Sequence, residues 1–243
     1  LMQAREGVRI GAENKLHSVF ARPIAMLGDM SRLLYRPFDT FNQIADKQIS
    51  MLPFGMVVLV LGMLSAVSVG FMRMHGAKII ADPLAYPALE NILPQLSDNM
   101  SLGFGQLAIS MVFAPMMSIC MVALFMFILS ALLKTGATFK QNIVLTSYAW
   151  TPMVVASLIN TLLVVLLPME QTMMRATMWD IIIPTAWQQS FIFSVLKVAD
   201  PFYLWMLFLL GTGAQTLYKR QGVIWYALVF IVFGIPIVFG LMG

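Results

Sequence analysis

The stretch 133–141 reads Leu133-Lys134-Thr135-Gly136-Ala137-Thr138-Phe139-Lys140-Gln141. It is a short basic turn between two long apolar runs. Gly136 can end the preceding helix, because glycine enters the left-handed backbone region without strain. Thr138 and Gln141 have the spacing of a capping box, in which the threonine caps the next helix and the glutamine bonds back. Lys134 and Lys140 place the turn on the water side of a membrane, so the stretch predicts two membrane helices joined by a tight turn.

The composition agrees with a membrane protein. Hydrophobic residues make up 60% of the 243 and charged residues 11%, and the mean hydropathy is +0.84. A soluble domain is about 45–50% apolar and about 25% charged. The net charge of +4 suits an anionic membrane surface rather than nucleic acid, because no Lys/Arg block with interleaved aromatic residues is present. The single cysteine, Cys120, excludes an internal disulfide.

Five apolar runs approach the roughly 20 residues that a bilayer core requires. We predict an all-α, polytopic membrane helix bundle with these five transmembrane helices. The expected spans are about 51–72, 102–133, 143–167, 202–218 and 222–242. The chain then divides into a cytoplasmic amphipathic lead-in, residues 1–50, and a five-span membrane domain, residues 51–243.

The lead-in has apolar residues at helical spacing. Pro37 suits the first turn of a short helix, with Phe38 and Phe41 on one face. This face is either an interfacial segment that binds a partner or a lead-in that lies on the membrane or on the bundle. Because the chain begins at Leu1 with a polar segment, we expect no signal peptide here and a natural start further upstream.

The distribution of Lys and Arg predicts the orientation. With the N-terminus in the cytoplasm, eleven of the fifteen lie on cytoplasmic segments and four on outside segments. The eleven are Arg5, Arg9, Lys15, Arg22, Arg32, Arg36, Lys47, Lys134, Lys140, Lys219 and Arg220, and the four are Arg73, Lys78, Arg175 and Lys197. This excess predicts a cytoplasmic N-terminus and a C-terminus outside.

Two sets of residues are candidates for packing and capping. Gly62, Ala66 and Gly70 lie four apart in the first span, a small-residue stripe that permits close helix approach. Asp200 and Pro201 open the fourth span as N-cap and first-turn proline, with Trp205 near its start.

The third span is the most polar. Tyr148, Thr151 and Asn160 lie in it, with Pro152 as a break point. These residues either line a polar pathway or make hydrogen bonds between helices, and Asn160 should face the bundle because an amide in lipid needs a partner.

Motifs for catalysis are missing from the sequence. We find no HExxH, GxSxG, phosphate-binding glycine loop or CxxC, and the five expected spans contain no Asp, Glu, Lys, Arg or His. We therefore expect no enzyme activity, no metal site and no cofactor, and a proton relay through the membrane is disfavoured.

Three short motifs resemble the Yip-domain family, polytopic membrane proteins named for interaction with Ypt/Rab GTPases. The motifs are Arg36-Pro37-Phe38-Asp39-Thr40-Phe41, Gly136-Ala137-Thr138-Phe139-Lys140-Gln141 running into Tyr148-Ala149-Trp150-Thr151-Pro152, and Asp200-Pro201-Phe202-Tyr203-Leu204-Trp205. The resemblance is greatest to bacterial members and covers roughly residues 35–240. It implies five spans, a cytoplasmic N-terminus, the bacterial cytoplasmic (inner) membrane and no catalytic residues.

The chain departs from the eukaryotic members at one place. They carry Asp-Leu-Tyr-Gly-Pro before the spans, where this chain has only Tyr35-Arg36-Pro37, and this argues against GTPase binding. Our leading hypothesis is a non-enzymatic membrane scaffold or accessory subunit, with membrane lipids and another membrane protein or a second copy as partners. The alternative is a channel or transporter for a neutral or weakly polar solute.

Overall fold

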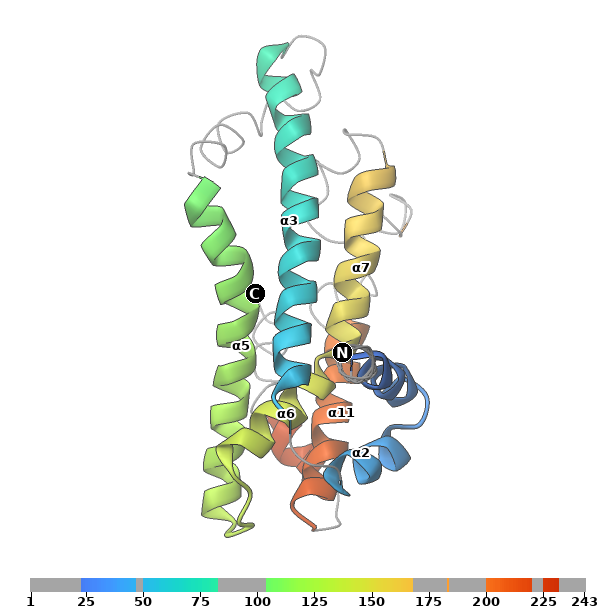
Figure 1. The fold of residues 1–243 in the computed structure, drawn as a ribbon, viewed down its shortest axis with the longest axis vertical. Helices are drawn as coiled ribbons and strands as arrows, with labels where there is room; N and C mark the ends of the chain where they lie inside the picture. The colour runs from blue at the N-terminus through green and yellow to red at the C-terminus, as the bar shows by residue number, and fades with distance from the viewer. Residues whose placement is uncertain are drawn as a thin grey trace, which may run out of the picture.

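A computed structural model describes residues 23–46, 50–82, 104–167, 183, 200–219 and 225–231, and every regular element in these ranges is a helix (Figure 1). The helices are α2 (Pro37–Asp46), α3 (Leu52–Ala81), α5 (Phe104–Leu132), α6 (Phe139–Ala149), α7 (Thr151–Leu166) and α11 (Pro201–Leu217), with residues 23–33 and 225–231 also helical. The predicted all-α class is confirmed for this part of the chain. Most of the expected fifth span and of both expected outside loops lies outside the described residues.

Within the described residues, two helices are long and apolar enough to cross a membrane, namely α3 and the stretch Ile109–Leu132 of α5. Their most apolar windows have mean hydropathies of 2.3 and 2.5, yet only 28% and 17% of each window is buried. Most of their apolar side chains therefore face outward, as expected in lipid. A third span is counted if α6 and α7, bent by 40° at their junction, cross the membrane together. The five-span plan and the orientation remain predictions.

The helix α3 is longer than the predicted first span, which ended at residue 72. The helix continues to Ala81 because Arg73 and Lys78 are good helix formers and the next proline is residue 83. Residues 52–72, at 1.5 Å each, span about 30 Å, the thickness of a bilayer core. The apolar run therefore ends before the helix does, and the end of the membrane span at residue 72 stays a prediction.

The helix α11 lies at the centre of one end of the bundle. It packs against α2, α6 and α7, while α3 packs against α5, α6 and α7. In Figure 1 α3 and α7 extend into the upper half, α5 runs along one side down to the bottom, and α2, α6 and α11 gather in the lower half. Met206, Leu207, Leu209, Leu210 and Ala214 of α11 are all at most 1% exposed. The main core is therefore built around α11, below the most exposed stretches of α3 and α5.

The short helix α2 docks directly on α11. Phe41 is 3% exposed, and a Cβ added at Gly213 would lie 2.9 Å from its Cε1 atom and 2.6 Å from Cδ1 of Leu145. Phe38 meets Phe208 edge to face, with ring centroids 6.4 Å apart. Because only glycine at residue 213 leaves room for this approach, α2 packs against the core as part of the bundle.

Gly213→Val should destabilise the protein by about 1–3 kcal/mol, since the added atoms must displace Phe41 and Leu145. The readout is thermal unfolding of detergent-purified protein by tryptophan fluorescence. Gly70→Val is the matched control, because a Cβ at Gly70 meets nothing within 4 Å. Equal unfolding temperatures for the two variants would contradict the tight α2–α11 contact.

Candidate functional site

The central turn contains the predicted capping box. The backbone N–H of Gln141 donates to Thr138 Oγ1 at 3.3 Å, and the backbone N–H of Thr138 donates to Gln141 Oε1 at 2.7 Å. Both orphan donors at the start of α6 are thus satisfied. Phe139 meets Phe127 of α5 edge to face at 5.9 Å, and Lys140 is exposed, so the turn closes tightly and presents its charge outward.

The helix α5 does not end as predicted. Gly136 has a positive φ of 77° as expected, but the left-handed residue that ends α5 is Lys134, with a φ of 51°. The Lys134 N–H donates to the Ala131 carbonyl and the Thr135 N–H to the Ser130 carbonyl, which is the bonding pattern of a Schellman motif. A lysine tolerates this conformation at a cost of about 1–2 kcal/mol. Two left-handed residues, rather than one, reverse the chain within so short a turn.

A buried polar network joins this turn to the end of α11. The Asn142 side chain is fully buried, and its Nδ2 donates to the Thr138 carbonyl at 2.9 Å. Its Oδ1 accepts a short hydrogen bond from the Tyr218 hydroxyl. The same hydroxyl lies 3.1 Å from the carbonyl oxygen of Met126 in α5. Three elements, α5, α6 and the end of α11, therefore meet at one amide and one phenol.

Trp225 extends the network into the helix of residues 225–231. Its ring lies 4.6 Å from that of Tyr218, centroid to centroid, and it is 1% exposed. The Trp225 Nε1, the Thr146 Oγ1 and the His75 Nδ1 are buried side-chain atoms without a hydrogen-bond partner. Among the described residues no group of three or more His, Cys, Asp or Glu side chains could hold a metal ion.

The third span is broken where Pro152 was expected to break it. Proline has no N–H to donate to the Tyr148 carbonyl, and the Thr151 hydroxyl donates to that carbonyl instead, at 2.6 Å. Trp150 lies at the junction, where it is both the C-cap of α6 and the N-cap of α7. Tyr148 and Thr151 are each 6% exposed, so both are in the core at the bend.

Asn160 lies further along α7 and is half-buried. The polar contact between α7 and α3 is made by its neighbour Thr161, whose Oγ1 lies 2.9 Å from Ser68 Oγ and donates to the Leu64 carbonyl at 3.3 Å. The polar residues of the predicted third span thus form two separate groups. One lies at the bend near Trp150, and the other makes the contact with α3 at Thr161. The structure does not gather Tyr148, Thr151 and Asn160 at one point.

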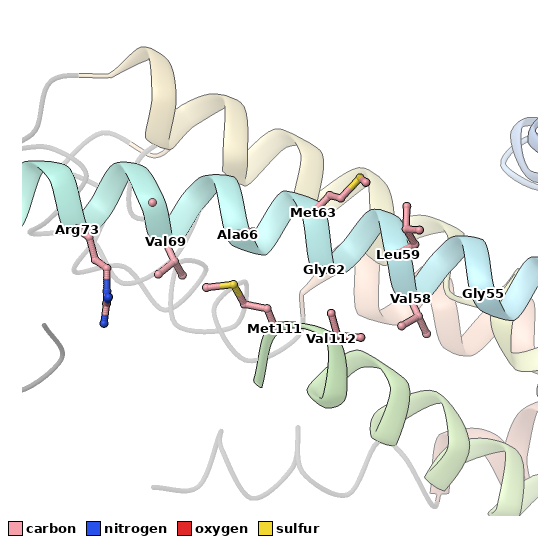
Figure 2. Close-up of a pocket in the computed structure, with 11 residues that line it drawn as sticks. Gly55, Val58, Leu59, Gly62, Met63, Ala66, Val69, Arg73, Met111 and Val112 are labelled. Carbon is pink, nitrogen blue, oxygen red and sulfur yellow. The ribbon is translucent and has the colours of Figure 1, made fainter. Parts of the chain in front are cut away.

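The small-residue stripe of α3 has two different surroundings. At Gly62, α5 comes so close that an added Cβ would lie 3.3 Å from Val112 and 3.6 Å from the Met111 carbonyl. Pro115 deprives that carbonyl of its usual donor four residues on. Ala66 and Gly70 are exposed and line a groove of about 600 Å³ between α3 and α5 (Figure 2). All three residues of the stripe line the groove, and only at Gly62 does α5 pack closely against it.

The predicted cap at the start of α11 is present. Asp200 Oδ1 accepts from the Phe202 N–H at 2.8 Å, and Pro201 is the first residue of α11. Trp205 is 42% exposed and its ring lies 6.1 Å from that of Phe208, one turn further along the helix.

Sequence reasoning missed the residues that join distant segments, above all Asn142, Tyr218 and Gly213. One signal was available: Asn142 is an amide directly after the capping box and inside an apolar run, where it must find a partner. The glycines at 211 and 213 in the fourth span also indicated a close approach, and Gly211 does contact the ring of Tyr226.

Tyr218→Phe should cost about 1–3 kcal/mol of stability, because it leaves the buried Asn142 oxygen without its donor. The double variant with Asn142→Leu should cost less than the sum of the two single variants, with a coupling of about 0.5–3 kcal/mol. Chemical unfolding in mixed micelles measures both. Tyr35→Phe, at a side chain that is 65% exposed, is the control. If the losses of stability in Tyr218→Phe and Asn142→Leu simply added up in the double variant, the hydrogen bond between these two side chains would be contradicted.

Comparison with known proteins places the chain in a family. A search of curated proteins and a search of solved structures gave no match. The family model of the Yip1 domain matches residues 31–242. This range contains the turn, the Asn142–Tyr218 network, the broken third span and the α3–α5 groove. The chain therefore belongs to the Yip1 domain family of membrane proteins.

Proposed function

We propose that this protein is a non-enzymatic integral membrane scaffold or accessory subunit, which holds a partner membrane protein through its N-terminal helices. In this proposal the chain crosses the membrane five times, with a cytoplasmic N-terminus, in the inner membrane of a bacterium. The proposal rests on the N-terminal helix, residues 23–33, which is fixed to the bundle and still presents an apolar face.

That helix has two apolar faces. Met26, Met30 and Leu33 are buried in the core, so the helix is held in place by the bundle. Ile24 and Leu27 are 67% and 52% exposed, and three residues apart they lie on one face. A rigid apolar face beside the exposed Arg32 and Arg36 is suited to an apolar partner surface with an acidic rim.

The double variant Ile24→Ser, Leu27→Ser should reduce co-purification of a stoichiometric partner from the native membrane at least tenfold, because it removes the apolar contact without touching the core. Quantitative mass spectrometry of the gentle-detergent complex is the measurement. Deleting residues 1–35 would also remove Met26, Met30 and Leu33, so the point variant is the cleaner test.

Leu132→Ser is the matched control, since Leu132 is 73% exposed on a different helix. If the partner stays bound in the double variant, or is lost equally in the control, the N-terminal face does not carry the interaction.

A channel or transporter for a neutral or weakly polar solute is the second candidate, and the broken third span favours it. Transporters often place their sites at discontinuous helices, and α6 and α7 are bent by 40° at Trp150. In liposomes, Asn160→Leu should then lower the flux of a small neutral solute such as glycerol, followed by light scattering. Leu158→Met, at a residue that is 46% exposed, is the control. Unchanged glycerol flux in Asn160→Leu would count against transport through this span.

A further inference from the structure

The groove between α3 and α5 has an unusual lining for a cavity in a membrane protein. Glycines, an alanine and aliphatic or methionine side chains form almost all of it, and Arg73 is its single charged residue. Its volume of about 600 Å³ is within the range of small-molecule sites, about 300–1,000 Å³. In Figure 2 Arg73 extends from α3 on the same side as Val69 and Met111. The groove is thus apolar along its length and cationic at one end.

The groove extends along α3 from Gly55 to Arg73, about 27 Å of helix, and its part between Gly62 and Arg73 has the length of one leaflet of a bilayer. Gly62, where α5 closes on α3, and Arg73 are eleven residues apart, which is about 16 Å along a helix. Half of a bilayer core is about 15 Å thick. Arg73 also follows directly on segment 52–72 of α3, which contains no charged residue, so we expect its guanidinium at the boundary between the hydrocarbon and the headgroups.

We propose that this groove is a phospholipid site, in which an acyl chain lies along Ala66 and Gly70 and an anionic headgroup phosphate pairs with Arg73. Guanidinium pairs with phosphate oxygens through two parallel hydrogen bonds. Small residues leave space for the chain, because a Cβ at Gly70 meets nothing within 4 Å. Arg73 already makes a contact within the protein, and a guanidinium, with five donors, can bind a phosphate oxygen beside such a contact.

A partner helix fits the groove less well. A helix with its side chains is about 10–12 Å across, and Met111 and Val112 of α5 already fill the space at Gly62. A helix would also cover Arg73 with apolar surface, whereas a phosphate brings the complementary charge.

The test is native mass spectrometry of the full, delipidated chain titrated with phosphatidylglycerol or phosphatidylcholine. Wild type should bind one phosphatidylglycerol about tenfold more tightly than phosphatidylcholine, and Arg73→Gln should remove this preference, since a charge-assisted hydrogen bond corresponds to about a factor of ten or more. Lys78→Gln is the matched control, because Lys78 is exposed on the same helix and does not line the groove.

Gly70→Phe should fill the groove and abolish the bound lipid for both headgroups. Val67→Phe adds a similar bulk at an exposed residue of α3 outside the groove and should leave binding unchanged. Equal lipid binding in wild type and Gly70→Phe overturns the site. Loss of a dimer in Gly70→Phe, with no lipid bound to wild type, would instead assign the groove to a second copy. Should Gly70→Phe fail to fold, the comparison of Arg73→Gln with Lys78→Gln decides alone.

Discussion

The buried amide of Asn142 constrains how the helices of this bundle meet. An amide withdrawn from water without partners costs about 1–3 kcal/mol or more, and Asn142 is fully buried. One of its partners, the Thr138 carbonyl, belongs to its own turn, but the other is the hydroxyl of Tyr218, 76 residues further along the chain. The end of α11 must therefore lie against the turn between α5 and α6, or the amide is left unsatisfied.

Once the end of α11 is fixed, the position of the N-terminal helices follows. The glycines at 211 and 213 give α11 two shallow faces, one occupied by the ring of Tyr226 and the other by Phe41 and Leu145. The helix α2 thus reaches the core through a glycine of the fourth predicted span. The family match begins at residue 31, before α2, so α2 lies within the family's domain rather than in an extension that precedes it.

Local chemistry was readable from the sequence, and long-range contacts were not. The capping box of Thr138 and Gln141, the Asp200 cap and the break at Pro152 each depend on residues within four positions, so spacing alone predicted them. That α5 ends at Lys134 rather than at Gly136 depends on the hydrogen bonds to the Ser130 and Ala131 carbonyls, which spacing does not reveal. The approach of Phe41 to Gly213 depends on tertiary packing, which hydropathy does not encode. The C-terminal end of α3 was predicted too early for a related reason. Hydropathy marks where an apolar run ends, and a helix can continue beyond that point into charged residues.

The two ends of the bundle are held together by different forces, and this difference explains the groove. Lipid tails are as apolar as leucine, so helices in a membrane associate only where small residues or hydrogen bonds draw them together. Near Asn142 and Tyr218 such bonds are concentrated, and the helices close around α11. Along the upper part of α3, Thr161 of α7 contacts Ser68 and the Leu64 carbonyl, while α5 makes its close approach at Gly62. The space between α3 and α5 forms the groove, which in our proposal is occupied by a phospholipid.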